Sequence, residues 1–368
     1  MKKSLIALAV LAASGAAMAQ SSVTLYGVLD TGLTYSKGKE SVYGLTHVGG
    51  NTNSRLGFRG VEDLGNGLKA TFNLEAGMGV DDGTDYFTGN GMAFRRTSTV
   101  GLAGNFGEVR LGRMLTSSYL AVSRYDAFGD TGIGASRAWG NGYAPRAENA
   151  ISYTSPSFNG FKFGGEYGFG EQKKARTSRY IGVGATYDNG PLSLGVGFDR
   201  MNDVAFAELD DSVTPAVVEK WSDDLTTWQL GGAYNFGVAK LLGFYKQTKY
   251  KEVGANDSAK FKTFGLGVTA PVGAAGELRV AYNHYRVSAD GGKTPKANQL
   301  SAGYVHNLSK RTALYGTYAY LKNKKDANMG LQLNGAMSLG KDAAGNQLLN
   351  LSNSGVQHGL QLGIRHAF

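Results

Sequence analysis

The sequence predicts an all-β protein: a transmembrane antiparallel β-barrel of about 16 strands, with short periplasmic turns and long external loops. Three observations predict it. Apolar and polar residues alternate in segments along the whole chain, and the connectors between segments are alternately short and long. The chain also has 55 Gly, 20 Tyr and 17 Phe but only six Pro among its 368 residues. This composition is too rich in Gly for a helical protein and too aromatic for a disordered one.

The first residues predict export. A basic start, residues 1–3, precedes an apolar run, residues 4–17, and a small-x-small cleavage site, Ala17-Met18-Ala19. We therefore expect a signal peptide over residues 1–19 and a barrel domain over residues 20–368. No later apolar run is long enough for a transmembrane helix, and there is no cysteine. The net charge of +9 is spread along the chain rather than gathered in one arm, so no nucleic-acid partner is predicted.

The alternation has a period of two residues, which is the period of a strand with one oily and one wet face. In residues 68–78 one parity is apolar, and the other holds Lys69, Asn73 and Glu75. The last segment, residues 356–368, alternates in the same way and stops on Phe368. In a closed barrel the last strand pairs with the first, residues 22–35, because lipid does not tolerate a free sheet edge.

A soluble β-sandwich or lectin-like domain is the alternative fold. A sandwich also alternates, but its inner face is a packed apolar core and its outer face carries charge. Here the polar face is rich in Gly, Ser, Thr, Asn and charges of both signs, as a wet lumen would be. Aromatic residues such as Phe158, Phe169 and Trp228 lie towards segment ends, which suits the aromatic girdles of a membrane barrel.

Several blocks of the sequence carry a family resemblance that covers the whole chain. They are SSVTLYGVLDTGL, SRLGFRGVEDLGNGLKATFNLE, FGEVRLGR, AISYTSPSFNGFKFGGEYG and the terminal Phe368. With the predicted signal peptide, they resemble Gram-negative general porins, most closely the β-proteobacterial class found in Burkholderia, Bordetella and Comamonas. The resemblance implies a sixteen-stranded barrel in the outer membrane, assembled as a homotrimer, whose third long loop folds into the pore.

The resemblance also implies partners and an activity. The expected activity is passive diffusion of ions and small hydrophilic solutes, without a cofactor. The expected surroundings are outer-membrane lipid and lipopolysaccharide, and Phe368 is expected to be part of the signal read by the barrel-assembly machinery.

A diffusion pore needs a narrow point whose lining charges select among solutes. The third long connector, residues 114–145, is expected to supply it by folding inward; the alternative is an external loop. On this connector Arg124, Asp126 and Asp130 are predicted to face the pore. The predicted basic wall opposite comprises Arg55, Arg59, Arg95, Arg96, Arg113 and Arg146.

The support for these arginines differs. Arg55 and Arg59 have the polar parity of their segment, and the family's basic cluster carries over onto Arg55, Arg113 and Arg146. Arg113 shares the parity of apolar residues, so it reaches the lumen only if its strand ends or bulges there. Arg95 has the lumen parity, whereas Arg96 lines up with an arginine common in the family, and both are retained.

Charged residues of lumen parity predict a weak preference for anions. The basic ones are Arg55, Arg59, Lys69, Arg95, Arg110, Arg146, Lys162, Arg279 and Arg365; the acidic ones are Asp30, Glu75, Glu148, Glu166, Asp199 and Glu277. A substrate-specific channel for phosphate or organic anions, and a purely structural or adhesive barrel, are the alternatives. No phosphate-binding loop, catalytic triad or metal-ligand spacing among the five His predicts an enzyme or a metal site.

Overall fold

The computed structural model describes residues 22–38, 41–84, 92–139, 145–170, 178–210, 217–252, 258–289, 294–325, 327, 329–331 and 355–368. The predicted signal peptide lies outside these residues. The strands are β1 (Ser22–Lys37), β2 (Ser41–Leu45), β3 (Arg55–Gly65), β4 (Leu68–Gly77), β5 (Thr97–Gly104), β6 (Gly107–Leu115), β7 (Arg146–Thr154), β8 (Phe161–Gly168), β9 (Tyr180–Asn189), β10 (Leu192–Asp210), β11 (Val217–Asn235), β12 (Lys240–Glu252), β13 (Ser258–Val272), β14 (Gly276–Ala289), β15 (Lys296–Asn307), β16 (Thr312–Lys324) and β17 (Val356–Ala367).

The helical elements are short: α2 (Ser117–Val122), η1 (Ser123–Tyr125) and η2 (Arg137–Trp139), the last two being 3₁₀ turns. Within the described ranges, no helix combines the length and the hydropathy needed to cross a membrane.

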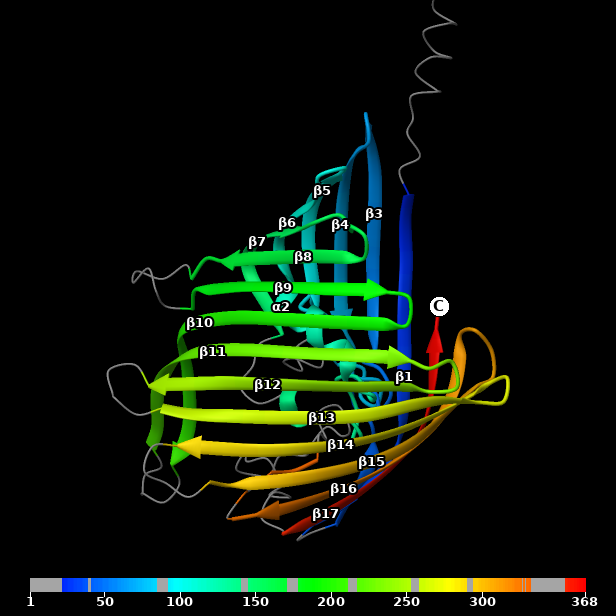
Figure 1. Ribbon diagram of the computed structural model, residues 1–368, viewed down its shortest axis with the longest axis vertical. Coiled ribbons are helices and arrows are strands. Elements are labelled where there is room, and N and C mark those ends of the chain that lie inside the picture. Colours follow the sequence, from blue (N-terminus) through cyan, green and yellow to red (C-terminus); the bar gives the residue numbers. More distant parts are fainter. Residues whose placement is uncertain are drawn as a thin grey trace, which may run out of the picture.

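The strands form one closed antiparallel sheet (Figure 1). Each strand from β3 onward pairs with its neighbour in sequence, and β17 pairs with β1 to close the ring. The short β2 and the longer β3 pair with successive parts of β1, so the seventeen strands fill sixteen positions. The predicted sixteen-stranded barrel is confirmed.

The end of the chain completes the closure. The register aligns Leu33 with Leu362, and it carries the pairing down to Ala367. Beyond the strand, Phe368 and Gly27 exchange two backbone hydrogen bonds of 3.1 Å. A Cβ on Gly27 would lie 2.4 Å from the Phe368 ring, so only glycine lets the terminal ring lie across β1. The predicted pairing of the last and first strands is confirmed, and Figure 1 shows the C-terminus beside β1.

The two faces of the sheet are inverted relative to a water-soluble protein. Apolar side chains point outward and are exposed, as Leu33 and Leu362 are, while Gln299 and Gln361 on the inner face are fully buried. Lipid would cover the outer face, and the polar inner face lines a lumen. The sandwich alternative is therefore wrong, because it requires an apolar interior between two sheets.

The third long connector folds into the barrel. Its helix α2 packs against the inner face of β8 to β11, within the curve of the sheet in Figure 1. Tyr119, Tyr125 and Trp139 from this loop form one apolar cluster with Leu242 and Phe244 of β12. The expectation that the loop folds inward is confirmed for residues 116–139, and the external-loop alternative is wrong.

Glycines on the wall give the loop room. A Cβ on Gly184 would lie 2.1 Å from the Ser117 carbonyl oxygen, and one on Gly195 would lie 2.1 Å from the Ala121 carbonyl oxygen. Real side chains cannot approach a backbone atom so closely. Glycine on the lumen parity of β9 and β10 therefore lets the backbone of α2 lie directly on the wall.

Candidate functional site: a charged constriction

Two of the predicted arginines, Arg55 and Arg96, contact Glu75 on the inner face of β4, and a third, Arg146, contacts Arg96. Arg96, just before β5, donates from Nε to a Glu75 carboxylate oxygen at 2.6 Å. Arg55, at the start of β3, has its Nε 3.5 Å from the other oxygen, which also accepts from the Tyr26 hydroxyl at 3.1 Å. Arg146, at the start of β7, donates from Nε to the Arg96 carbonyl at 2.8 Å. We call Arg55, Arg96 and Arg146 the basic cluster.

The basic cluster is organised by its one carboxylate. Like charges at close range repel, and Glu75 neutralises part of that charge. The side chain of Arg96 is 7% exposed and that of Arg55 is 27% exposed, so Arg55 has the greater access to the lumen. The structure thus joins Arg55 and Arg146, both of lumen parity, to Arg96, whose orientation the sequence left open.

Arg59 lies on the same inner face. Its guanidinium lies 5.2 Å from the centre of the Tyr26 ring, a cation–π contact, and its side chain is exposed. The register places it opposite Asn73, closer than Arg55 to the β3–β4 turn. Arg59 is therefore a neighbour of the basic cluster through Tyr26 and lies nearer the short-turn end.

The ambiguous pair resolves in favour of Arg96. Arg96 directs its side chain to Glu75, and its backbone N–H donates to the Glu75 carbonyl. Arg95 is exposed, and its carbonyl accepts from Arg113 Nε at 2.6 Å. Both residues lie before the start of β5, in a segment where side chains do not alternate as they do in a strand. Parity therefore favoured Arg95, whereas the structure directs Arg96 to Glu75.

The placement of Arg113 in the pore wall is wrong. The register pairs Arg113 with Ser98, and Ser98 with Leu74, on the same face as the exposed Leu111. A bulge does occur here, since the pairing with β7 shifts between Gly112 and Met114.

The bulge does not turn Arg113 inward, because its extra residue belongs to β7. Gly112 pairs with Ala150 and Met114 pairs with Ala147. Between these two pairs β6 advances by two residues and β7 by three, so β7 carries the extra residue. The alternation of β6 is therefore preserved, and Arg113 points outward, where it donates to Glu148 at 2.7 Å.

Asp126 does not present its charge to the pore. It is buried and accepts hydrogen bonds from the backbone N–H groups of Phe128 and Ser136, at 3.0 and 2.9 Å, and from Trp139 Nε1 at 3.0 Å. Burial raises the pKa of this carboxyl to about 6, while the three donors oppose that shift. The prediction that Asp126 lines the constriction is wrong; it fixes the fold of the loop.

Asp130 is linked to the basic cluster through Tyr119. It accepts a hydrogen bond from the Tyr119 hydroxyl and another from Thr131 Oγ1 at 3.1 Å. Burial and the Asp130 carboxylate raise the pKa of Tyr119, and the positive charge of Arg146 acts in the opposite direction. Asp130, Tyr119 and Arg146 therefore belong to one electrostatic neighbourhood.

Arg124 lies apart from the basic cluster. It pairs with Asp188 and with the Ser193 hydroxyl, which flank the short β9–β10 turn. Its guanidinium also covers the Tyr125 ring at 5.3 Å. The structure therefore places Arg124 near the short-turn end of the lumen, whereas Glu75 lies towards the end of β4 that is farther from the short turns.

Sequence reasoning missed the residues that anchor the third loop. Glu166 accepts from the Ser117 N–H at 2.9 Å and from its hydroxyl at 2.6 Å, and Asp199 accepts from the Ser118 hydroxyl at 2.7 Å. Lys246, also buried, donates from Nζ to the Ala138 carbonyl at 2.7 Å. Their lumen parity was the available signal, but parity alone does not say which lumen residues a loop will cover.

A second anchor holds the first loop, residues 46–54 between β2 and β3, inside the barrel. Asp30 is fully buried and accepts from the N–H groups of Gly50 and Thr52, at 2.9 and 2.8 Å, and from the Tyr315 hydroxyl at 2.7 Å. A Cβ on Gly132 would lie 2.0 Å from the Gly50 carbonyl, so the third loop touches the first. Two loops, rather than one, narrow the lumen.

The anchors change the charge that the lumen presents. Of the acids with lumen parity, Asp30, Glu166 and Asp199 are 0%, 6% and 2% exposed, because loops cover them. Arg55, Arg110 and Arg59 on the same wall keep contact with the lumen. The accessible balance is therefore more basic than the count of residues predicts.

Comparison with known proteins identifies the family of this chain. The sequence model of the Gram-negative porin family matches residues 5–326. Outer membrane porin protein 32 of Delftia acidovorans is 47% identical, with 100% of both chains covered. An outer membrane porin protein of Bordetella pertussis is 33% identical, over 88% of this chain and 95% of that one.

Solved structures agree with the fold. The anion-selective porin from Comamonas acidovorans superposes with a TM-score of 0.78 at 42% identity, covering 95% of this chain and 100% of that one. OmpT of Vibrio cholerae in its trimer form gives a TM-score of 0.72 at 17% identity, over 95% and 99% of the chains, a likeness of fold alone. This chain belongs to the Gram-negative porin family and is an outer-membrane β-barrel.

Proposed function

We propose that this porin is a water-filled channel for passive diffusion of ions and small hydrophilic solutes, and that it prefers anions. The basic cluster, Arg55, Arg96 and Arg146, forms one side of the constriction, with Arg59 beside it and Asp130 on the side of the third loop. One observation carries this proposal: the loops bury three lumen acids, Asp30, Glu166 and Asp199, and leave Arg55 and Arg59 accessible.

The mechanism is electrostatic and needs no reaction. Fixed positive charge in a narrow, low-dielectric passage raises the local concentration of anions and lowers that of cations. Salt screens such fields over about 10 Å at 0.1 M ionic strength. The preference should therefore be largest in dilute salt and decrease as salt is added.

The similarity to known porins supports the proposal. The relative from Comamonas acidovorans, 42% identical, is an anion-selective porin. The family and the fold are those of a channel rather than an enzyme.

The partners follow from the same arguments. OmpT of Vibrio cholerae has a trimer form, and we propose a homotrimer for this chain. The exposed apolar outer face suits outer-membrane lipid and lipopolysaccharide. We assign Phe368, which closes the barrel against Gly27, to the signal that the barrel-assembly machinery reads.

The test is ion selectivity in a planar bilayer. The refolded protein is compared with Arg55→Gln/Arg146→Gln, and the reversal potential is measured across a KCl gradient. We expect chloride preference in the parent and a smaller preference in the double variant. Arg113→Gln is the matched control, since it removes an arginine from the outward face. Cation preference in the parent, or equal reversal potentials in the double variant and the parent, would overturn the proposal.

A further inference from the structure

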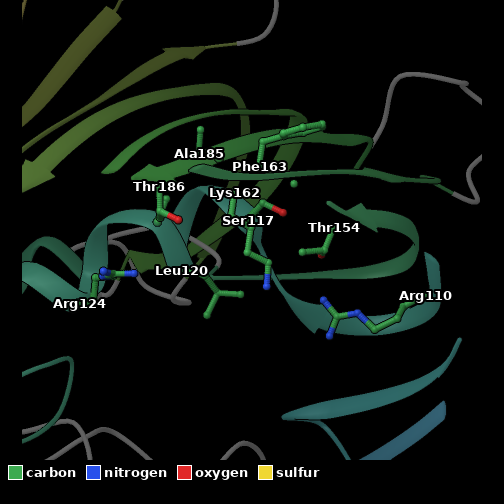
Figure 2. Close-up of a pocket in the computed structure, with 12 residues that line it drawn as sticks. Arg110, Ser117, Leu120, Arg124, Thr154, Lys162, Phe163, Ala185 and Thr186 are labelled. Atoms are coloured by element: carbon green, nitrogen blue, oxygen red, sulfur yellow. The ribbon is translucent and has the colours of Figure 1, made fainter. Parts of the chain in front are cut away.

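A cavity of about 190 Å³ lies between the start of the third loop and the inner face of β6 to β9 (Figure 2). The charged and hydroxyl-bearing residues that line it are Arg110, Ser117, Arg124, Thr154, Lys162 and Thr186. None of the lining residues is acidic. The cavity is distinct from the basic cluster, because it shares no residue with it.

Three cations reach this cavity from three elements. Arg110 comes from β6, Lys162 from β8 and Arg124 from η1. In Figure 2, Arg110 and Arg124 enter from opposite sides, and Leu120 lies between them. Lys162 is paired in the register with Thr186, near the short turns that join β7 to β8 and β9 to β10. The cavity therefore lies towards the short-turn, periplasmic end of the lumen.

Two of the three cations around the cavity have an acidic partner within the described ranges, and the third does not. Arg124 is opposed by Asp188, and Arg110 Nε lies 3.7 Å from a Glu108 oxygen. In the part of the chain that the structure describes, Lys162 has neither a hydrogen bond nor an ion pair. Lys162 is therefore the one of the three lining cations that has no acidic partner among the described residues. The arrangement matches a monovalent anion better than a divalent one.

The rest of the lining is compatible with an apolar body on that anion. Leu120 and Ala121 present methyl groups, and Leu120 is exposed although it lies inside the barrel. Ser117 is already bound to Glu166, so the hydroxyls of Thr154 and Thr186 are the remaining small polar groups. At about 30 Å³ per water, the cavity holds roughly six waters' worth of volume. A small organic ion fits this space.

We propose that this cavity is a second anion-binding subsite, on the periplasmic side of the third loop, for a monovalent carboxylate with a short apolar body. Lys162 and Arg110 hold the carboxylate, and Leu120 packs against the body. The subsite rests on the proposed function, since it gives a carboxylate a second position along the anion path after the basic cluster.

The test is block of the chloride current by a defined probe. Benzoate is titrated against the wild-type channel in a planar bilayer, with benzyl alcohol as the neutral probe and inorganic phosphate as the oxyanion without an apolar body. We expect benzoate to reduce the current at concentrations where the other two have little effect. Lys162→Gln should weaken the block roughly three- to five-fold, the range of a partly exposed charge contact. Leu120→Ser should weaken the block by benzoate but leave the response to phosphate unchanged.

Lys69→Gln is the matched control, because Lys69 is an exposed lumen-parity lysine at the short-turn end of β4, outside the cavity. Equal block of the wild-type and Lys162→Gln channels would overturn the subsite. Phosphate block as strong as benzoate block would overturn its assignment to carboxylates. A wild-type channel that fails to prefer chloride would instead refute the proposed function, so the two failures are distinguishable.

Discussion

Replacing Gly184 by alanine should displace the third loop from the barrel wall. A Cβ at this position would lie 2.1 Å from the Ser117 carbonyl oxygen, 2.5 Å from its carbonyl carbon and 3.0 Å from the Ser118 nitrogen. Ordinary contact begins near 3.4 Å, so the carbonyl must move by about 3.4 − 2.1 = 1.3 Å. Ser117 is also bound to Glu166 through its N–H and its hydroxyl, so α2 cannot move without straining these bonds.

The expected cost follows from these contacts. Overpacking a well-packed interior costs about 1–3 kcal/mol, and weakening a hydrogen bond to a charged group adds an amount of the same order. Because the wall lies on one side of α2, the only direction open to the helix is into the lumen. Gly184→Ala should therefore lower both the free energy of unfolding and the single-channel conductance.

The assay pairs urea unfolding with single-channel recording of the refolded protein. The matched control is Gly243→Ala on β12, where the nearest atoms to a new Cβ lie at 3.4 and 3.6 Å, an ordinary distance. Gly243 has the outward parity, so the third loop does not touch it. If Gly184→Ala and Gly243→Ala gave the same conductance and the same unfolding midpoint, direct contact between α2 and the wall would be refuted.

Two further predictions concern buried charges. Glu75→Gln should increase the preference for chloride and cost about 1–3 kcal/mol of stability, because it removes the negative charge that Arg96 binds at 2.6 Å. The reversal potential measures the change in ion preference, and urea unfolding measures the change in stability. A shift of the reversal potential towards cation preference would contradict the argument. Lys246→Met keeps an apolar stem but leaves the Ala138 carbonyl without its donor, so brief closures should become more frequent in single-channel records. The exposed Lys251→Met should not change them, and equal closure rates in the two variants would count against Lys246 as an anchor.

The barrel could be predicted from the sequence because its main signal is local. Alternation with a period of two is set by strand geometry, and the requirement for closure then pairs the last strand with the first. The parity of Arg55 and Arg59 was sufficient to place both on the inner face. The inward path of the third loop came from the family resemblance, although glycines of lumen parity such as Gly184 and Gly195 carried a signal for it.

The constriction was harder to predict because it lies where alternation ends. Arg96 precedes β5, so its side chain is directed by its hydrogen bond to Glu75 and not by parity. The orientation of the Arg113 side chain depended on which of two paired strands carried the extra residue of a bulge, and the sequence does not show which strand that is. Asp126 looked like a pore acid, but the backbone donors that bury it exist only once the loop has folded.

The burial of lumen acids has a physical cause that links the fold to selectivity. A loop that folds into a barrel brings backbone N–H groups away from water, and each needs an acceptor. Carboxylates can accept several such bonds at once, whereas Arg and Lys side chains cannot accept any. Asp30 and Glu166 do this for the first and third loops, and Lys246 serves the rarer case of a carbonyl that needs a donor. Anchoring two loops thus removes acids from the pore surface in preference to arginines, so the anion preference that we propose for the channel would arise from the same contacts that narrow it.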